Sequence, residues 1–396
     1  MKDKNLHNLK EKKMNSMLKT TMILMIGFIA LGIVPMAGEK ALKAAEQGEF
    51  VLVPVENPKY NRNELFPAYE DYYSPRVKKL RDRYNLDQVV AGESDEWKRI
   101  LLLRHWIRTN IDIENVNPTK TRGDTFGILD AALKGGGFHC THFSIVQHAV
   151  YNSFGYVTRR LGSGPGLKSK DKGGHHGINE VWVNKFCKWV LIDGKYDLHY
   201  EKDGIPLSAL EIRDEVWKDD ARSVVRCFGP DCKRTTELYK DESWGPHPEA
   251  YRWVSWETST NRFTSFPAPG SSSLVMYADD IYKNNTWFRS SKPHWAYNTP
   301  SLIATPVRDW IYWTPNVITS KVTLKSDSVS VRLTSFTPNL RSYQAKRGSA
   351  AWIDCNEAVE FPLKKELNDF AFRTINLFGV TGPENHIKVD WKNKDE

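Results

Sequence analysis

The feature that most constrains the fold of this chain is a change in the spacing of its apolar residues between residues 96 and 193. Apolar residues recur at helical intervals from Glu96 to about Asn110, and helical patterns follow over residues 125–133 and 140–153. A run of three glycines at 135–137 separates the last two patterns, and Gly155 stands where a left-handed cap would end the third. Consecutive helices therefore come first in this part of the chain.

Short runs rich in Val, Ile, Trp and Tyr follow these helices, with turn residues between them. They cover residues 156–161, 179–183 and 188–193. Because the strands follow one another and do not alternate with helices, the order predicts an α+β fold with antiparallel strands.

The chain length predicts more than one domain. Its 396 residues exceed what one hydrophobic core serves, since single cores stop growing at about 250–300 residues. After a polar, irregular lead-in at 39–95, we expect the α+β domain at 96–245 and an aromatic-rich connecting region at 246–315. Alternating apolar residues and turn signals predict a β-sandwich of the immunoglobulin or fibronectin type at 316–396.

The N-terminus has the pattern of an export signal. An uncharged apolar stretch from Met22 to Gly38 follows six lysines, which is typical of a signal peptide. Since roughly 17 apolar residues lie at the lower limit of a bilayer span, an uncleaved membrane anchor is the alternative for residues 1–38. Both interpretations place the rest of the chain outside the cytoplasm, as a periplasmic, secreted or outward-facing protein.

The basic charge of the chain does not indicate a nucleic-acid partner. Six lysines and two acidic residues ahead of the apolar stretch account for +4 of the formal net charge of +8. No helix-turn-helix, zinc-finger or RNA-recognition pattern accompanies the remainder. We therefore expect no nucleic-acid partner, and membrane contact only through the N-terminal segment.

Cys140 is the candidate nucleophile, because it opens the third helical pattern. A helix start lowers the pKa of a thiol through the helix dipole and the unpaired N–H groups there, and the preceding glycines allow a sharp entry. Downstream, His176 precedes one predicted strand and Asp193 ends the neighbouring one. His176 would take the thiol proton, and Asp193 would orient its ring and stabilise its positive charge.

Four motifs carry a resemblance to the transglutaminase-like superfamily. They are G-G-G-F-H-C-T-H-F at 135–143, G-Y-V-T-R-R-L-G-S-G at 155–164, H-G-I-N-E-V-W-V at 176–183 and W-V-L-I-D at 189–193. The resemblance implies a papain-like fold for 96–245 and a Cys140, His176, Asp193 triad. The chain departs from the family at Gly177 and Ile178, where Ala and Trp are usual, and at His139, where a small residue is usual.

Other histidines lie near the candidate site in sequence. The interval H-x-x-x-E favours His176 over His175, because it places the histidine four residues before Glu180. We expect structural or substrate-contact roles for His139, His142 and His148. The glycine- and lysine-rich loop at 162–177 is either a mobile cationic rim of the site or a solvated connection.

The five cysteines are odd in number, so at least one is unpaired. Cys227 and Cys232 flank a turn sequence that can close a small disulfide loop, while their spacing does not fit a zinc site. We expect Cys187 and Cys355 to be buried structural thiols. No metal or cofactor is predicted.

These features predict an exported cysteine hydrolase or acyltransferase that acts on an amide bond through a Cys140 thioester. Its substrate would be an extracellular or periplasmic protein, a peptide or a wall polymer. Two alternatives stay open: a glycan-binding protein with a vestigial triad, and an enzyme that acts on an anionic polysaccharide through a His/Tyr acid–base pair.

Overall fold

The computed structural model describes residues 48–114, 123–164, 176–236, 248–267, 272–281 and 302–393. The expected leader at 1–38, His175 and most of the glycine- and lysine-rich loop lie outside these ranges. Within them, no helix is both long and apolar enough to cross a bilayer.

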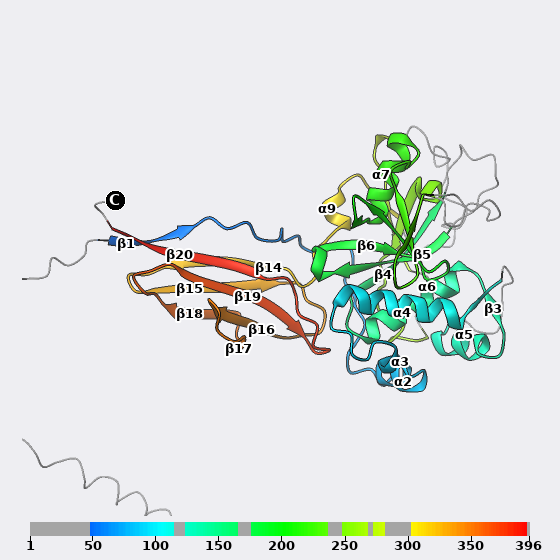
Figure 1. Ribbon diagram of the computed structural model, residues 1–396, viewed down its shortest axis with the longest axis horizontal. Coiled ribbons are helices and arrows are strands. Elements are labelled where there is room, and N and C mark those ends of the chain that lie inside the picture. Colours follow the sequence, from blue (N-terminus) through cyan, green and yellow to red (C-terminus); the bar gives the residue numbers. More distant parts are fainter. Residues whose placement is uncertain are drawn as a thin grey trace, which may run out of the picture. The chain divides into compact units, whose positions relative to one another are not determined.

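A six-stranded sheet forms the centre of the α+β part, in the order β13-β12-β11-β4-β5-β6 (Figure 1). Its strands are β4 (Thr158–Gly164), β5 (His176–Val183), β6 (Lys188–Ile192), β11 (Trp253–Glu257), β12 (Leu274–Tyr277) and β13 (Leu302–Thr305). Neighbouring strands are antiparallel, except that β12 and β13 are parallel. Three of the six strands come from residues 246–315, so the expectation of a mere connecting region there was wrong.

Helices cover both faces of this sheet. One face packs against α2 (Pro75–Arg83), α3 (Leu86–Val89), α4 (Glu96–Asn110), α5 (Thr125–Ala132) and α6 (Cys140–Ser153), and the other packs against α7 (Ala209–Asp219) (Figure 1). Alternate residues of one strand enter different cores: Val181 joins the larger helical side, while Trp182 joins the α7 side. This alternation confirms the α+β expectation of helices packed on antiparallel strands.

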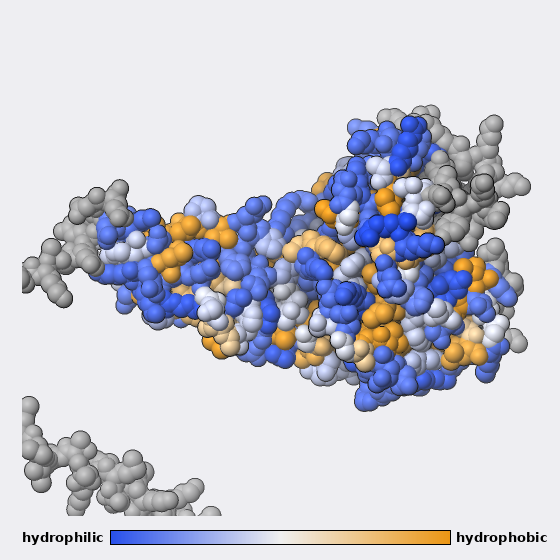
Figure 2. Space-filling view, viewed as in Figure 1, coloured by the Kyte–Doolittle hydropathy of each residue, from blue (hydrophilic) through white to orange (hydrophobic). Residues whose placement is uncertain are grey.

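Smaller elements surround the central sheet. They are the short parallel pair β2 (Asp112–Ile113) and β3 (Gly137–Phe138), the sheet of β7 (Leu198–Lys202), β8 (Ile205–Pro206), β9 (Val225–Phe228) and β10 (Lys233–Thr235), the short helix α9 (Arg308–Ile311), and the 3₁₀ turns η1 (Asn184–Phe186) and η2 (Pro248–Tyr251). On the face seen in Figure 2, hydrophilic residues surround small, separate hydrophobic patches. Most large apolar side chains are instead part of the internal clusters.

Two antiparallel sheets share one apolar cluster in the C-terminal part. One has the order β1-β20-β19-β16-β17 and the other β14-β15-β18. Their bounds are β1 (Gly48–Val53), β14 (Ile318–Leu324), β15 (Ser328–Ser335), β16 (Leu340–Arg347), β17 (Ile353–Cys355), β18 (Ala358–Pro362), β19 (Asn368–Asn376) and β20 (Asn385–Asn393). Strand β1 pairs along β20 from Gly48 opposite Asn393 to Val53 opposite Lys388. Residues 39–95 are therefore more than an irregular lead-in, because they supply a sheet strand here and two helices to the α+β part.

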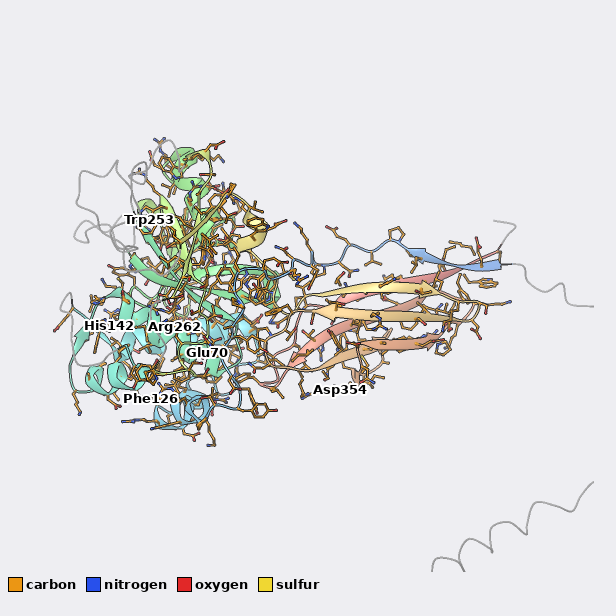
Figure 3. The ribbon with its side chains drawn as sticks, turned by 180° about the vertical axis from the view of Figure 1, so that it is seen from behind. Glu70, Phe126, His142, Trp253, Arg262 and Asp354 are labelled. Atoms are coloured by element: carbon orange, nitrogen blue, oxygen red, sulfur yellow. A yellow bond between two sulfur atoms is a disulfide. The ribbon has the colours of Figure 1, made fainter. Side chains whose placement is uncertain are left out.

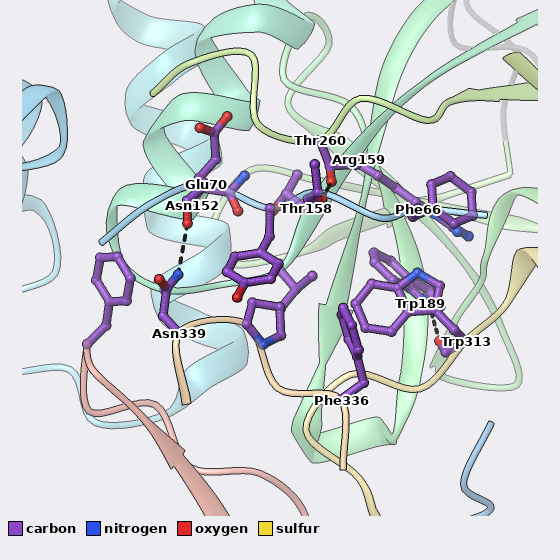
Figure 4. A pocket seen from close by; sticks show the side chains of 16 residues that line it. Phe66, Glu70, Asn152, Thr158, Arg159, Trp189, Thr260, Trp313, Phe336 and Asn339 are labelled. Atoms are coloured by element: carbon purple, nitrogen blue, oxygen red, sulfur yellow. Dashed lines mark hydrogen bonds between the residues drawn. The ribbon is translucent and has the colours of Figure 1, made fainter. Parts of the chain in front are cut away.

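Aromatic and amide side chains connect the α+β part with the C-terminal sheets. Trp189 Nε1 donates a hydrogen bond to the carbonyl oxygen of Trp313 at 2.6 Å, and the ring of Phe336 meets that of Trp313 edge-on at 4.9 Å (Figure 4). Asn339 Nδ2 donates to the carbonyl oxygen of Glu70 at 2.8 Å (Figure 4).

Gly155 is a second point of close approach. It has φ +81°, which confirms the expected left-handed position after α6, and a Cβ there would lie 2.5 Å from the Cβ of Phe378. Asn376 Nδ2 also donates to the carbonyl oxygen of Gly155 at 3.0 Å. The glycine thus ends a helix and makes room for a side chain that follows β19.

Candidate active site

Cys140 is the first residue of α6, as the sequence predicts. The chain reaches it through Gly135, whose φ is +83°, and through the short strand β3. Its side chain is half-buried. The His142 N–H donates to the carbonyl oxygen of His139 at 3.0 Å, while the N–H groups of Cys140 and Thr141 precede the first acceptor that a helix provides.

His176 and Asp193 meet at the ends of two paired strands. His176 opens β5 and Asp193 directly follows β6. The His176 Nε2 atom lies 2.6 Å from Asp193 Oδ2, and both side chains are buried. The other carboxylate oxygen of Asp193 accepts the backbone N–H groups of Lys195 at 2.9 Å and Tyr196 at 3.2 Å. With its carboxylate fixed in this way, Asp193 holds the His176 ring in one orientation.

The thiol of Cys140 is hydrogen-bonded to His176, which joins the three side chains in one chain of contacts. Burial disfavours the thiolate, but hydrogen bonds from His139 and His176, the charge of His176 and the Gly177 N–H outweigh burial and lower the pKa of Cys140 to about 4. Burial also disfavours the imidazolium, yet Asp193 and Cys140 together raise the pKa of His176 to about 9. At pH values between these two pKa values, the Cys140 thiolate and the His176 imidazolium form the stable pair.

His139 is a part of the site whose role the sequence did not reveal. It is the N-cap residue of α6, its side chain makes no cap hydrogen bond, and it bonds to the Cys140 thiol instead. A histidine in place of the small residue usual in the resembled family was the signal that could have indicated this contact. The thiol therefore faces two imidazoles.

Other residues of the four motifs meet in a buried cluster together with Trp256. Arg159 donates from Nε and Nη2 to the same oxygen of Glu180, at 3.1 and 2.8 Å, and both residues are buried. Trp256 Nε1 donates to that oxygen at 2.8 Å, and the guanidinium of Arg159 lies 4.1 Å from the ring centre of Trp189. The arginine, glutamate and tryptophan of these motifs thus hold β4, β5 and β6 together, while Cys140 and its partners carry the polar chemistry.

The other histidines near Cys140 in sequence have separate partners. Burial and the neighbouring His139 lower the pKa of His142 to about 4, and its Nδ1 has no hydrogen-bond partner among the described residues. His148 Nε2 lies 2.8 Å from Glu70 Oε1, with both side chains buried. His148 therefore has a buried carboxylate partner, and the roles expected of both histidines stay predictions.

The structure joins Cys227 and Cys232 in a disulfide. Cys187 and Cys355 are partly exposed, so the expectation of buried thiols was wrong. Cys187 has φ +50° and ends the turn η1 between β5 and β6, while Cys355 ends the short strand β17. Both therefore lie at the end of an element and not inside one.

His199 and Glu201 lie beside that disulfide, and one ligand atom from each of the four residues falls within 4.8 Å of the others. The His199 ring is already committed, because Nδ1 accepts from Arg104 Nη1 at 2.9 Å and Nε2 donates to Glu201 at 3.0 Å. A neutral imidazole has only one acceptor nitrogen, and in His199 that nitrogen is Nδ1, which accepts from Arg104. Nε2 carries the proton and so has no lone pair for a metal. The contacts favour a disulfide with a structural histidine over a metal centre.

The aromatic residues that suggested glycan stacking are mainly interior. Trp253, Trp256 and Trp313 are buried, and Trp253 is seen within the α+β part in Figure 3. Trp310 is 48% exposed, while Trp287 and Trp295 lie outside the described residues. The buried tryptophans serve the core and are not available to a sugar ring.

Comparisons with known proteins give distant structural neighbours. No protein-family model matches the sequence, and no curated protein matches it. A candidate cysteine protease from Cytophaga hutchinsonii matches at TM-score 0.24 and 16% identity, over 32% of this chain and 40% of that one. Red sea bream transglutaminase matches at TM-score 0.27 and 11% identity, over 82% of this chain and 60% of that one. This chain spans less than two thirds of either neighbour, and neither match supplies its function.

Proposed function

We propose that this protein is a transglutaminase-like cysteine enzyme that attacks an amide carbonyl with Cys140. The observation that carries the proposal is the continuous contact from the Cys140 thiol through His176 to Asp193, together with a thiol pKa lowered to about 4. An inert structural cysteine gains nothing from such an environment, since burial alone would raise its pKa.

The chemistry follows from these contacts. The Cys140 thiolate adds to the amide carbon, and the oxyanion that forms is stabilised by first-turn N–H groups of α6. The His176 imidazolium gives its proton to the leaving nitrogen as the carbon–nitrogen bond breaks, which leaves a thioester on Cys140. His176, now neutral, takes a proton from water or from an amine, and this nucleophile then releases the acyl group and restores the thiolate. Asp193 stabilises the charged ring in both halves.

The proposal includes a papain-like core for residues 96–245 and an immunoglobulin- or fibronectin-like sandwich for 316–396. It also includes export, with an extracellular or periplasmic protein, peptide or wall polymer as substrate. The lysine-flanked apolar stretch at 1–38 supports export, and the Cys227–Cys232 disulfide is compatible with it.

The test is a product analysis with a peptide mixture incubated with the full chain. New termini or new isopeptide bonds, read by mass spectrometry, would distinguish hydrolysis from transfer, and hydroxylamine would trap the thioester. We expect Cys140→Ala to abolish every product and Cys355→Ala, a matched cysteine change on strand β17, to leave them unaltered. Equal turnover by Cys140→Ala would overturn the proposal and favour the polysaccharide alternative.

A further inference from the structure

A cavity of about 320 Å³ lies beside α6, the helix that begins with Cys140. Its walls come from four elements distant in sequence: α2, the start of α5, the middle of α6 and strand β4, closed by the segment Arg262–Pro267. Figure 3 labels Arg262 among the side chains of the α+β part. The volume lies at the lower end of the range for small-molecule sites, which corresponds to one amino-acid side chain and its backbone.

Three arginines, Arg76, Arg160 and Arg262, line this cavity. Arg160 donates from Nε to Ser144 at 3.3 Å and from Nη1 to Glu257 at 3.2 Å, which uses two of its five N–H donors. The Arg160 side chain is 14% exposed, so the remaining donors lie in a largely dry environment. A ligand with acceptor oxygens would find guanidinium donors there that no described residue uses.

Arg76 supplies the second observation that indicates a ligand. It pairs with Asp124 through Nη2, while its Nε is buried and has no hydrogen-bond partner among the described residues. Its guanidinium lies 4.9 Å from the ring centre of Phe266 and 5.1 Å from that of Phe263. These rings exclude water from one side of the charge, which strengthens its attraction for an anion.

Apart from Thr125 and His148, the rest of the lining is apolar or glycine. Ile145, Phe263, Phe266 and Pro267 provide carbon surface beside the guanidinium groups. A cavity with both features suits a short aliphatic chain that ends in a carboxylate, and guanidinium and carboxylate groups match in planar geometry.

The distance along α6 relates the cavity to the bond that Cys140 attacks. Arg160 bonds to Ser144, which lies four residues after Cys140 and so about 6 Å along α6. An extended peptide advances about 3.3–3.6 Å per residue. Two residues of such a peptide therefore span the distance from Cys140 to Ser144, which would bring a side chain two or three residues from the reacting bond toward Arg160.

We propose that this cavity is a subsite for an acidic side chain, glutamate or aspartate, two or three residues from the amide bond that Cys140 attacks. The proposal rests on the function proposed above, and it assigns that function a substrate class: acidic peptides or acidic segments of proteins.

The experiment profiles products from a peptide library in which every position carries all amino acids. We expect glutamate and aspartate to be enriched at one position within three residues of the reacting bond. Arg160→Gln should reduce kcat/KM for a matched glutamate peptide about tenfold, because a hydrogen bond to a charged group is lost, and should reduce it less for the glutamine peptide, so that the ratio of the two falls. Arg160→Lys keeps the charge and should keep part of the preference. Arg332→Gln, the same change at an exposed arginine of β15, should keep all of it.

The outcomes separate the two proposals. Turnover without an acidic preference, or a preference that survives Arg160→Gln, would overturn the subsite and leave the cysteine chemistry intact. If no peptide in the library reacts, the proposed function fails. Calorimetric titration of Cys140→Ala with acetyl-Glu-Ala-Ala-amide and acetyl-Gln-Ala-Ala-amide then tests whether the cavity binds an acidic side chain. Equal binding of the two peptides would refute it, and tighter binding of the glutamate peptide that Arg160→Gln abolishes would support it.

Discussion

Replacing His176 with glutamine removes the positive charge that stabilises the Cys140 thiolate and leaves the burial that opposes it. In the wild-type protein the pKa of Cys140 is lowered to about 4, with hydrogen bonds from His139, His176 and Gly177 offsetting burial. In His176→Gln the contacts with His139 and Gly177 remain but the charge of His176 is gone, so we expect the pKa to rise toward the ordinary thiol value of about 8.5.

The two proteins should then differ in how fast Cys140 reacts with a disulfide reagent, and the sign of the difference should depend on pH. At pH 6 the wild-type residue is almost wholly thiolate, while a thiol of pKa 8.5 is ionised to roughly 0.3%. A thiolate of lower pKa is also a weaker nucleophile, by about a hundredfold over this interval for a Brønsted coefficient of 0.4–0.5. Wild type should therefore react about threefold faster at pH 6 and roughly twentyfold slower at pH 8.

The assay measures the rate of mixed-disulfide formation with dithiodipyridine at several pH values, with each cysteine followed by peptide mass spectrometry. Cys187 and Cys355 act as internal controls in both proteins. Burial raises the pKa of each, to about 11 for Cys355, so their rates should climb with pH throughout. A wild-type Cys140 rate that rises tenfold per pH unit between pH 6 and 8 would refute the ion pair.

Three further predictions concern stability. Burial lowers the pKa of His199 to about 4 in the folded protein. Between pH 6.5 and pH 4, His199 is therefore protonated in the unfolded chain and neutral in the folded chain. As the pH falls through this window, the free energy of unfolding should decrease by about 3 kcal/mol. Urea titrations of His199→Gln, whose amide does not titrate, should show a flatter pH dependence, and identical slopes would contradict this. Arg159→Met should lower the free energy of unfolding by about 3–5 kcal/mol, because it leaves the buried Glu180 carboxylate without its cation, and adding Glu180→Gln should recover part of the loss. Gly155→Ala should cost about 2 kcal/mol or more through its positive φ and its clash with Phe378; a double-mutant cycle with Phe378→Gly, which removes the Cβ that the new methyl group would meet, should recover the clash component, and strict additivity would argue against that contact.

Much of the local structure could be predicted from the sequence, because helical and strand periods are properties of neighbouring residues. The helix that begins at Cys140, the left-handed Gly155 and the strand pair that carries His176 and Asp193 are examples.

Contacts between distant segments could not be predicted in this way. Strands β11 to β13 look like an aromatic connection until the pairing of β11 with β4 is known, because no local pattern records which edge a strand joins. The bond between His139 and the thiol depends on a side-chain orientation at a helix start, which spacing does not encode. The cavity of three arginines assembles from four elements, and none of the arginines is distinctive in its own segment.

The pairing of β1 with β20 has a consequence for how the chain is made. Gly48 is the first described residue to be synthesised and Asn393 the last, yet they lie opposite each other in one sheet. A chain that emerges from a ribosome or an export channel N-terminus first must therefore keep β1 unpaired while the whole α+β part is produced. That exposed edge is open to pairing with another molecule until the final strand arrives. Deleting β20 would leave the residues around Cys140 present but this edge permanently open, so C-terminal truncation should first appear as aggregation during production.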